Sequence, residues 1–335
     1  MIPDSSEYVY LRNHPLHEEF ARLCVRHESA AYPAWVGRFG SQVVRNLVSL
    51  LGSLGKPRRK VFLIEGPGAL AAVLLRRAPG CRIIMIHADP TLYFLKKQGR
   101  FRRWLTLRLL AKVDAMLHPA HLMQDLATGY FPKAFHGVFH LYVDTRRWKP
   151  LPSGGMDFLC IGRADHFKNQ ELLVRALYAI REKHGMDVRL HVVGNIHPTY
   201  ESTLRPLLGD SVSFTGWKAH PWEDLPAVGY YFNLARLEPS GTNILEALGL
   251  GLAPIVSMGC GYAEDVVAGI DRNLFVPPEL DKVVAAWEYL HFMPVEARCE
   301  LREKCLATAR AWNRDRAHER FKTVFAEALA ASGVA

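Results

Sequence analysis

The run Arg236-Leu-Glu-Pro-Ser-Gly-Thr-Asn-Ile-Leu-Glu-Ala-Leu-Gly-Leu-Gly251 places two glutamates, Glu238 and Glu246, eight residues apart. A Pro-Ser-Gly turn follows Glu238 and predicts the start of a short helix, with Glu246 in its first turn. The backbone N–H groups of residues 240–243 would then point out of the helix start, where unpaired donors and the helix dipole attract phosphate. Carboxylates beside a bound phosphate suit the hydroxyls of a sugar and a ribose.

A simpler interpretation needs no ligand. Asn243-x-x-Glu246 also fits a capping box, in which an N-cap side chain and a glutamate three residues later begin a helix. The local pattern by itself favours this interpretation, so the rest of the chain has to decide between the two.

Length and composition indicate a two-domain globular protein. The chain has 335 residues, of which 49% are hydrophobic and 22% charged. We expect no transmembrane helix and no secretory signal. Six scattered cysteines indicate reduced thiols and a cytoplasmic location. The net charge of +9 favours acidic partners: nucleotide phosphates, anionic lipid or nucleic acid.

Short apolar runs alternate with helical patterns along the whole chain, which predicts parallel sheets covered on both faces. A Pro/Gly/Ser-rich stretch at 148–155 separates two series of strands. The predicted domains are therefore residues 1–148 and 149–335, with a terminal helix at Arg314–Ala331. The predicted strands are Glu7–Arg12, Lys60–Glu65, Arg82–His87, Asp114–Leu117, Gly137–Leu141, Asp157–Gly162, Val188–Gly194, Ser211–Phe214, Tyr230–Leu234 and Ala253–Ser257.

Three strand ends in the second half carry residues suited to a nucleotide. Gly162 and Arg163 end one strand, and Lys168 follows before a predicted helix at Gln170–Lys183. A guanidinium fork and a mobile ammonium could clamp a diphosphate, although exposed Arg/Lys pairs are usually only solvated. The next two strands end in Gly194-Asn195 and Gly216-Trp217-Lys218, where a base could lie or the chain could simply turn.

Together these features resemble the nucleotide-binding half of the retaining glycosyltransferases of GT-B architecture, family 4 (glycosyl transferases group 1). The resemblance covers about residues 136–330. The motifs occur in the family's order: Val143-Asp144-x-x-x-Trp148-x-Pro150, Gly162-Arg163 with Lys168, Gly194, Phe214-x-Gly216, Glu238-x7-Glu246, Ala253-Pro-Ile-Val-Ser, Gly261, Ala263-Glu264, Gly269, Asn273-Leu-Phe-Val-Pro277 and Trp312.

The resemblance implies an α/β fold of two doubly wound Rossmann-like domains facing across a cleft. The first domain would serve the acceptor and the second a nucleotide-sugar, with the terminal helix bridging them. It also implies roles for residues: Arg163 and Lys168 hold the donor diphosphate, Glu246 binds the ribose, and Glu238 binds a hydroxyl of the transferred sugar. The turn Ser240, Gly241, Thr242 and Asn243 would face the phosphates, and Trp217 or Lys218 would lie near the base. Asn195 would belong to the donor site, and His87 would contact the sugar or the acceptor.

The implied reaction is the transfer of a hexose, with retention of configuration, from a nucleoside-diphosphate sugar to a hydroxyl of an acceptor. The acceptor is expected to be lipid-linked or a precursor of a cell-surface glycan. No Asp-x-Asp pair is present, so we expect no metal ion that bridges the diphosphate. The resemblance implies no cofactor, since the nucleoside-diphosphate sugar is a co-substrate. Positive side chains and the helix start would then stabilise the leaving group. The departing phosphate oxygen would accept the proton of the acceptor, and Glu238 is not assigned as a covalent nucleophile.

The sequence departs from the family at several positions. Ser240 replaces an aromatic residue, Asn233-Leu-Ala-Arg236 replaces a Pro-Ser pair, and Asn169 replaces a common glycine. The family's N-terminal Gly-rich loop is missing, although Gly66-Pro-Gly68 could serve a related purpose. The sugar and the acceptor are therefore left open.

Residues 94–113 carry seven basic side chains and no acidic one. If a helix runs unbroken past Gly99, apolar residues from Leu105 to Leu117 share one face and basic residues share the other, with Trp104 among them. Such a face suits an anionic membrane surface at the cytosolic side. It also suits a core helix with a solvated cationic face, or contacts to phosphate, and nucleic acid is the weaker alternative. The basic residues concerned are Lys96, Lys97, Arg100, Arg103 and Arg108.

Two other functions fit parts of the chain. One is a non-catalytic membrane- or partner-binding protein on a degenerate transferase scaffold, suggested by the missing loop and by Ser240. The other is a dinucleotide-dependent oxidoreductase that uses Gly66-x-Gly68-x-x-Ala71 with Asp89, which leaves the second domain unexplained.

Overall fold

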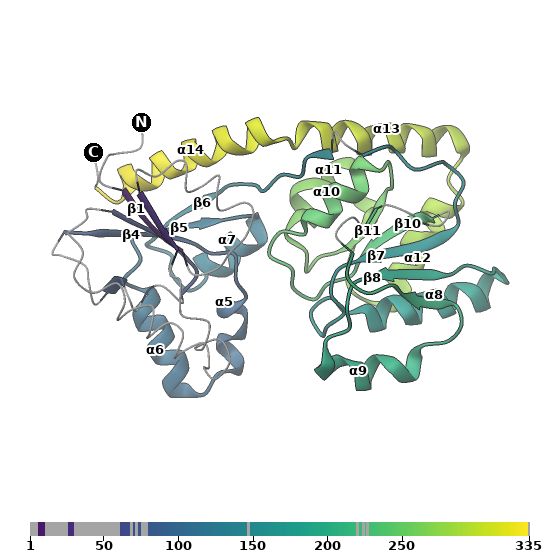
Figure 1. Cartoon of the computed structure of the whole chain (residues 1–335), viewed down its shortest axis with the longest axis horizontal. Coiled ribbons are helices and arrows are strands. Elements are labelled where there is room, and N and C mark those ends of the chain that lie inside the picture. Colours follow the sequence, from purple (N-terminus) through teal and green to yellow (C-terminus); the bar gives the residue numbers. More distant parts are fainter. Residues whose placement is uncertain are drawn as a thin grey trace. The chain divides into compact units, whose positions relative to one another are not determined.

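The computed structural model describes residues 6–10, 26–29, 61–67, 70, 73–74, 80–145, 148–218, 221–222, 225 and 228–333. The chain divides into two compact units (Figure 1). The first comprises Met1–Pro119, Met123–His140 and Glu319–Ala335, and the second comprises Ala120–Leu122 and Leu141–His318. The predicted division into domains 1–148 and 149–335 stays a prediction.

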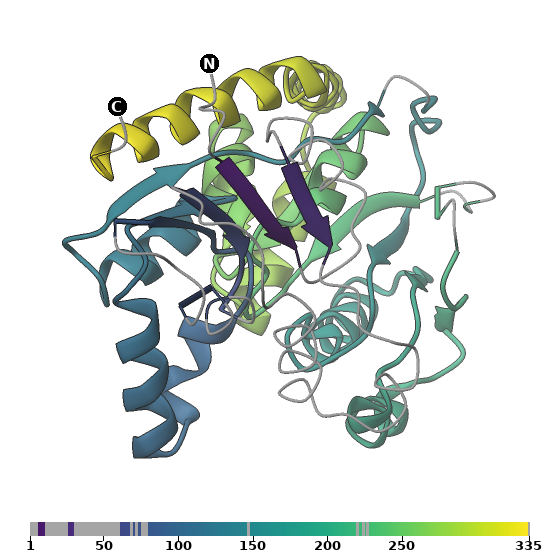
Figure 2. The ribbon, with the colours of Figure 1, turned by 60° about the vertical axis from the view of Figure 1, so that its left-hand side comes forward.

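The first unit is built on a parallel sheet with the order β2-β1-β3-β4-β5-β6 among its described residues. Figure 2 shows β1 and β2 side by side, running in the same direction. The strands are β1 (Ser6–Tyr10), β2 (Arg26–Ser29), β3 (Val61–Glu65), β4 (Arg82–Ile86), β5 (Ala115–His118) and β6 (Phe135–Val138). The helices are α5 (Thr91–Phe94), η1 (Leu95–Lys97), α6 (Arg100–Leu110) and α7 (His121–Thr128), together with most of α14 (Arg314–Ala331).

The second unit contains a parallel sheet with the order β12-β11-β10-β7-β8-β9 among its described residues, with α10 and α11 on one face and α8 on the other (Figure 1). Its strands are β7 (Asp157–Ile161), β8 (Leu190–Val193), β9 (Val212–Phe214), β10 (Val228–Asn233), β11 (Pro254–Ser257) and β12 (Phe275–Val276). Its helices are α8 (Gln170–His184), α9 (Pro198–Leu204), η3 (Arg205–Leu207), α10 (Thr242–Gly249), the π-helical η4 (Ala263–Val267), α11 (Ala268–Ile270), η5 (Arg272–Leu274), α12 (Leu280–His291) and α13 (Val295–Ala311).

The apolar runs explain where the strands form. β3 reads Val-Phe-Leu-Ile-Glu and β4 reads Arg-Ile-Ile-Met-Ile, and their apolar side chains are buried, as expected for strands covered on both faces. Each of the ten predicted strands has a counterpart, and the terminal helix has its predicted bounds. The prediction of an α/β fold with two doubly wound parallel sheets is confirmed, whereas the cleft between them stays a prediction.

The topology of the second sheet singles out one position. The chain begins in the middle at β7, adds β8 and β9 on one side, and then crosses over to add β10, β11 and β12 on the other. β7 and β10 are therefore neighbours whose connections leave in opposite directions. Doubly wound sheets bind ligands beyond the carboxyl ends of the strands at such a switch point.

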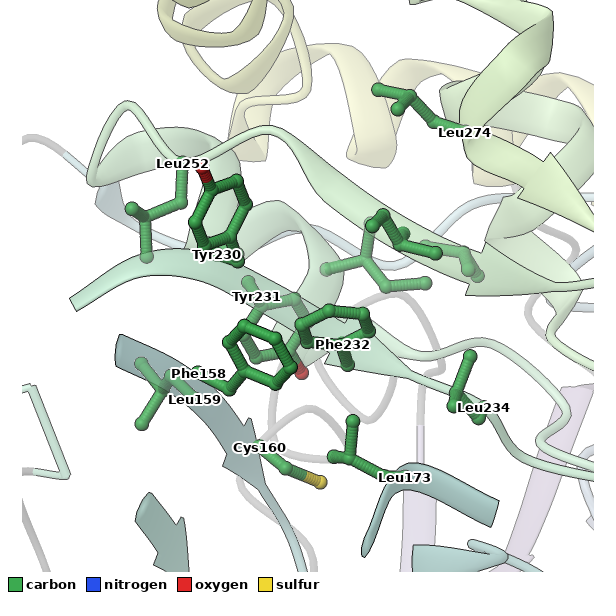
Figure 3. Packing of buried hydrophobic residues seen from close by; sticks show 14 of the residues in the cluster. Phe158, Leu159, Cys160, Leu173, Tyr230, Tyr231, Phe232, Leu234, Leu252 and Leu274 are labelled. Carbon is green, nitrogen blue, oxygen red and sulfur yellow. The ribbon is translucent and has the colours of Figure 1, made fainter. Parts of the chain in front are cut away.

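Aromatic side chains fill the core of the second unit (Figure 3). The ring of Phe158 on β7 lies 4.8 Å from that of Phe232 on β10 and 6.2 Å from that of Trp287 on α12, measured between ring centroids. These rings fix the strands β7 and β10, whose ends carry the polar residues described below.

We expect Phe158→Ala to lower the free energy of unfolding by about 3–5 kcal/mol, because it leaves a cavity between β7, β10 and α12. Chemical denaturation followed by circular dichroism measures this loss. The matched control is Phe292→Ala, whose ring is 64% exposed and whose loss should be about 1 kcal/mol or less. Equal losses for the two variants would contradict the described core.

Candidate functional site

The loop that carries Glu238 is fixed by its backbone. Glu238 N donates to Gly259 O at 2.8 Å, and Gly261 N donates to Glu238 O at 2.9 Å. Tyr262 N donates to Ser240 O at 2.8 Å. A side chain at Gly259 or at Gly261 would overlap the backbone of residues 235–239. The segment after β11 therefore holds the segment after β10, and the position of Glu238 follows from main-chain contacts.

The carboxylate of Glu238 has two partners. Its Oε1 forms an ion pair with Lys168 Nζ, and its Oε2 accepts a hydrogen bond from Asn233 Nδ2 at 2.7 Å. The Lys168 and Glu238 side chains are only 21% and 14% exposed. Burial alone would lower the pKa of Lys168, but the charge and hydrogen bond of Glu238 outweigh it and raise that pKa, so the ammonium stays charged.

Asn243 joins this pair to the end of β7. Its Oδ1 accepts from Asn233 Nδ2 at 3.1 Å, and its Nδ2 donates to Ile161 O at 2.7 Å. The next residue, Gly162, has φ of +138°, and a Cβ there would lie within 4 Å of Lys168 and of Asn243. Lys168, Glu238, Asn233 and Asn243, which we call the Lys–Glu cluster, therefore lie at the switch point between β7 and β10.

The capping-box interpretation is wrong. Helix α10 begins at Thr242, and its N-cap is Gly241 in the left-handed region at φ +84°, without a side-chain cap. Asn243 lies inside the helix, with its side chain directed to Asn233 and Ile161. The first N–H groups of a helix have no intrahelical acceptor. This helix start is therefore open to an anion, as the phosphate interpretation requires.

Glu246 lies in the second turn of α10, one turn later than predicted, because the helix starts at Thr242. It is half-buried. Burial raises its pKa to about 7; a hydrogen bond with Trp222 lowers it and the charge of Glu238 raises it. A carboxyl group with this pKa changes its charge near neutral pH.

Arg163 forms an ion pair with Asp165, and its predicted contact with a donor diphosphate stays a prediction. Its Nε and an Nη donate to Asp165 Oδ2 at 3.0 and 2.8 Å, and its side chain is 63% exposed. Asp165 is buried, and its Oδ1 accepts from Phe167 N at 2.9 Å and from Lys168 N at 3.0 Å. Asp165 thus positions both predicted cations, although the guanidinium of Arg163 does not join the Lys–Glu cluster in the described residues.

The predicted base-binding residues lie along the same sheet edge. Ala164 N donates to Asn195 O at 2.9 Å, which places the segments after β7 and β8 side by side. Asn195 Oδ1 accepts from Trp217 N at 2.9 Å, and this links the segment after β9. The Trp217 side chain is 73% exposed, and Lys218 is half-buried. Whether a base binds here stays a prediction.

The other predicted contacts belong to the first unit. His87 follows β4 and is buried. Lys96 and Lys97 lie in η1, separate from α6, because the helix begins only after Gly99. The condition for one continuous basic face, a helix that runs unbroken past Gly99, is not met. Helix α6 ends at Leu110, and Met116 and Leu117 lie in β5, which matches the predicted strand Asp114–Leu117. Gly68 and Ala71 of the dinucleotide motif lie outside the described residues.

Three residues of the site were not among the predicted site residues: Asp165, Asn233 and Asn169. The sequence shows Asn233 and Asn169 only as departures from a family pattern. An aspartate just before a predicted helix commonly accepts hydrogen bonds from the N–H groups two and three residues later. This turn and cap pattern could have identified Asp165. Asn169 has φ of +56°, the left-handed region that a glycine adopts easily, which explains why a glycine is common there. Its side chain also donates to Leu234 O at 3.3 Å.

Residues 144–312, just over half of the chain, match the family described as Glycosyl transferases group 1. No curated protein matches the chain in sequence.

Solved structures share its fold at low sequence identity. A UDP-forming alpha,alpha-trehalose-phosphate synthase from Burkholderia xenovorans has a TM-score of 0.72 at 12% identity, with 97% of this chain and 99% of that one covered. Anabaena HepE in complex with UDP and glucose has a TM-score of 0.69 at 14% identity, covering 96% and 91%. The trehalose-6-phosphate structure from E. coli with UDP-2-fluoro glucose has a TM-score of 0.70 at 13% identity, covering 95% and 98%.

We expect Glu246→Gln to stabilise the protein more at pH 8 than at pH 5. Because the folded pKa of Glu246 is about 7 and the ordinary value is 4.5, its contribution to stability is full below pH 4.5 and is lost as the pH rises through 7. Glutamine avoids that loss, so the difference between the two pH values should be about 1–3 kcal/mol in chemical denaturation. The exposed Glu182 supplies a control, Glu182→Gln; a pH-independent effect at Glu246 would refute the assignment.

Proposed function

The chain belongs to the glycosyl transferases group 1 family, and we propose that it moves a hexose from a nucleoside-diphosphate sugar to an acceptor hydroxyl with retention and without a metal ion. Membership of this family makes it a nucleotide-sugar-dependent glycosyltransferase. The hexose, the retention, the metal independence and the acceptor belong to the proposal. The acceptor that we propose is lipid-linked or a precursor of a cell-surface glycan.

The Lys–Glu cluster carries this proposal. A half-buried ammonium and a half-buried carboxylate lie at the switch point of a doubly wound sheet, next to the open start of α10. A diphosphate needs positive charge and N–H donors, whereas a sugar needs hydrogen-bond acceptors. This one location offers both.

Each side chain then has a definite task. Lys168 and the N–H groups at the start of α10 stabilise the charge that develops on the departing diphosphate. Glu238 accepts a hydrogen bond from a hydroxyl of the transferred sugar and orients the ring, while Glu246 accepts from the ribose. The leaving phosphate oxygen takes the proton of the attacking hydroxyl on the same face of the sugar. Arg163, held by Asp165, reaches the diphosphate from the exposed side.

The general test is turnover by purified protein in EDTA with UDP, GDP and ADP sugars. UDP-glucose is the first donor to try, because the Anabaena protein of the same fold was solved with UDP and glucose. Donor hydrolysis or transfer in EDTA is expected. Binding to liposomes without turnover of any donor would support the non-catalytic alternative.

A double-substitution experiment separates catalysis from folding. We expect Lys168→Met and Glu238→Gln each to lower kcat roughly 100-fold or more, because each removes a charge that acts on the donor. Each also leaves the opposite partner unpaired, so each should lower the unfolding temperature.

The double variant Lys168→Met/Glu238→Gln contains no unpaired charge, so its unfolding temperature should recover while its activity does not. Activity that recovers together with stability would show that the ion pair is only structural. Lys183→Met, at a lysine that is 59% exposed on α8, is the matched control.

A second feature supports contact with a membrane. Phe101 and Trp104 on α6 are 71% and 51% exposed, and their rings stack with centroids 5.9 Å apart. Arg108 lies over the Trp104 ring at 5.2 Å from its centroid. Helix α6 extends away from the strands of its own unit (Figures 1 and 2). Among the described residues, no helix is long and apolar enough to cross a membrane.

An exposed aromatic pair among cations, in a segment without acidic residues, suits an anionic lipid surface. The basic neighbours Lys96, Lys97, Arg100 and Arg103 would face lipid headgroups while the rings enter the interface. We therefore propose that the enzyme binds peripherally at the cytosolic membrane face, where a lipid-linked acceptor is available.

We expect sedimentation with phosphatidylserine-containing vesicles and little binding to pure phosphatidylcholine vesicles. Phe101→Ser/Trp104→Ser should weaken vesicle binding at least roughly tenfold, because two large apolar groups no longer enter the interface. Phe292→Ser, at an exposed ring of the second unit, should leave binding unchanged. Equal binding by all three proteins would contradict a role for α6.

A further inference from the structure

Three histidines form a hydrogen-bonded row inside the first unit. His87 follows β4, His118 ends β5 and His136 lies in β6, and these strands are neighbours in the sheet. His87 Nδ1 and His118 Nδ1 lie 3.2 Å apart, and His118 Nε2 and His136 Nδ1 lie 3.0 Å apart. His136 Nε2 lies 2.8 Å from Phe131 O. His87 and His118 are 1% and 0% exposed, and His136 is half-buried.

The carbonyl of Phe131 determines the direction of this row. A carbonyl oxygen only accepts, so His136 Nε2 must carry the hydrogen. In a neutral imidazole the other nitrogen is then bare, so His136 Nδ1 accepts from His118 Nε2. By the same reasoning His118 Nδ1 accepts from His87 Nδ1. His87 Nε2 is thereby left without a hydrogen.

The surroundings keep the two buried rings, those of His87 and His118, neutral. Burial lowers the pKa of His87; Asp89 opposes that shift, and His136 adds to it. Burial and the two neighbouring histidines lower the pKa of His118 well below its ordinary value. Neutral rings are the condition under which each has one donor and one acceptor nitrogen.

The end of the row points to a ligand. His87 Nε2 is buried and has no hydrogen-bond partner among the described residues, and the same holds for Asp89 Oδ2. The other oxygen of Asp89 accepts from Thr91 N at 2.8 Å, which fixes the carboxylate. Buried polar atoms are normally paired. Two unpaired acceptors two residues apart, after β4, therefore suit a molecule with several hydroxyl donors.

We propose that His118 and His136 are positioning residues that hold His87 in the tautomer with a bare Nε2, so that His87 accepts a hydrogen bond from a hydroxyl of a bound polyhydroxyl ligand. The row transmits the acceptor character of one backbone carbonyl, at Phe131, to a ring nitrogen two strands away. The identity of that ligand as the sugar or the acceptor rests on the proposed function, whereas the tautomer does not.

The tautomer is measurable in the free protein. Protein with ¹⁵N-labelled histidine gives long-range proton–nitrogen correlations that distinguish protonated from bare ring nitrogens, and His87→Gln identifies the signals of His87. At about pH 8, where histidine is ordinarily neutral, we expect a protonated Nδ1 and a bare Nε2 on His87. A hydrogen on His87 Nε2 would overturn the proposal, whatever the enzyme's activity.

Two substitutions at His136 test the transmission. Glutamine can still accept from His118 and donate to Phe131 O, so His136→Gln should keep the His87 tautomer. Leucine can do neither, so His136→Leu should give a mixed or reversed tautomer of His87. Circular dichroism and thermal unfolding establish that both variants are folded, and an unchanged tautomer in folded His136→Leu would refute the positioning role.

Kinetics complete the test with the donor that turns over. kcat/KM should fall roughly 10- to 100-fold in His136→Leu and stay within about threefold in His136→Gln, because only leucine alters the acceptor at His87. Equal losses in both variants would show that His136 acts on the fold and not through His87. If no donor turns over, the proposed function fails, and the spectra still decide the direction of the row.

Discussion

The ion pair between Lys168 and Glu238 is the interaction around which the polar residues at the switch point of the second sheet are arranged. Two opposite charges that are mostly removed from water are tolerated only when they face each other and their remaining hydrogen-bonding capacity is satisfied. Lys168 precedes α8, and Glu238 follows β10, some seventy residues later in the chain. For the charges to meet, β7 and β10 must be adjacent, which is the pairing at the switch point of the sheet. Asn233 then supplies the hydrogen bond that the carboxylate still lacks.

Much of the fold could be predicted from the sequence because parallel strands that are buried on both faces consist of continuous apolar runs. The strands β2 and β12 could not be predicted in this way. β2 reads Arg-His-Glu-Ser, which contains no apolar run, and β12 has only two residues. The break at Gly99 could not be predicted either, because helical spacing continues across it while the structure forms η1 before it and α6 after it.

The sequence predicts which residues form the candidate site better than it predicts which of their side chains contact each other. Glu238, Lys168, Gly162 and Asn243 come together as expected. The partner of Arg163 and the bridging role of Asn233 depend on side-chain directions, which spacing along the chain does not determine. A departure from a family pattern was the only sign that Asn233 was unusual, and the structure gives it a physical meaning: an amide group here connects the carboxylate to Asn243. The grouping of His118 with His136 likewise needed the strand order.

Backbone hydrogen bonds connect residues 238 and 240 to residues 259–262. The location of the acidic group is thus encoded by glycines on a different loop and is independent of the acid itself. A mutation that replaces the acid alters the chemistry while leaving its scaffold in register. A mutation of Gly259 or Gly261 does the reverse, because the added side chain displaces the backbone that carries an intact Glu238. Position 238 can therefore change its side chain without a change in these backbone contacts, whereas positions 259 and 261 leave no room for any side chain.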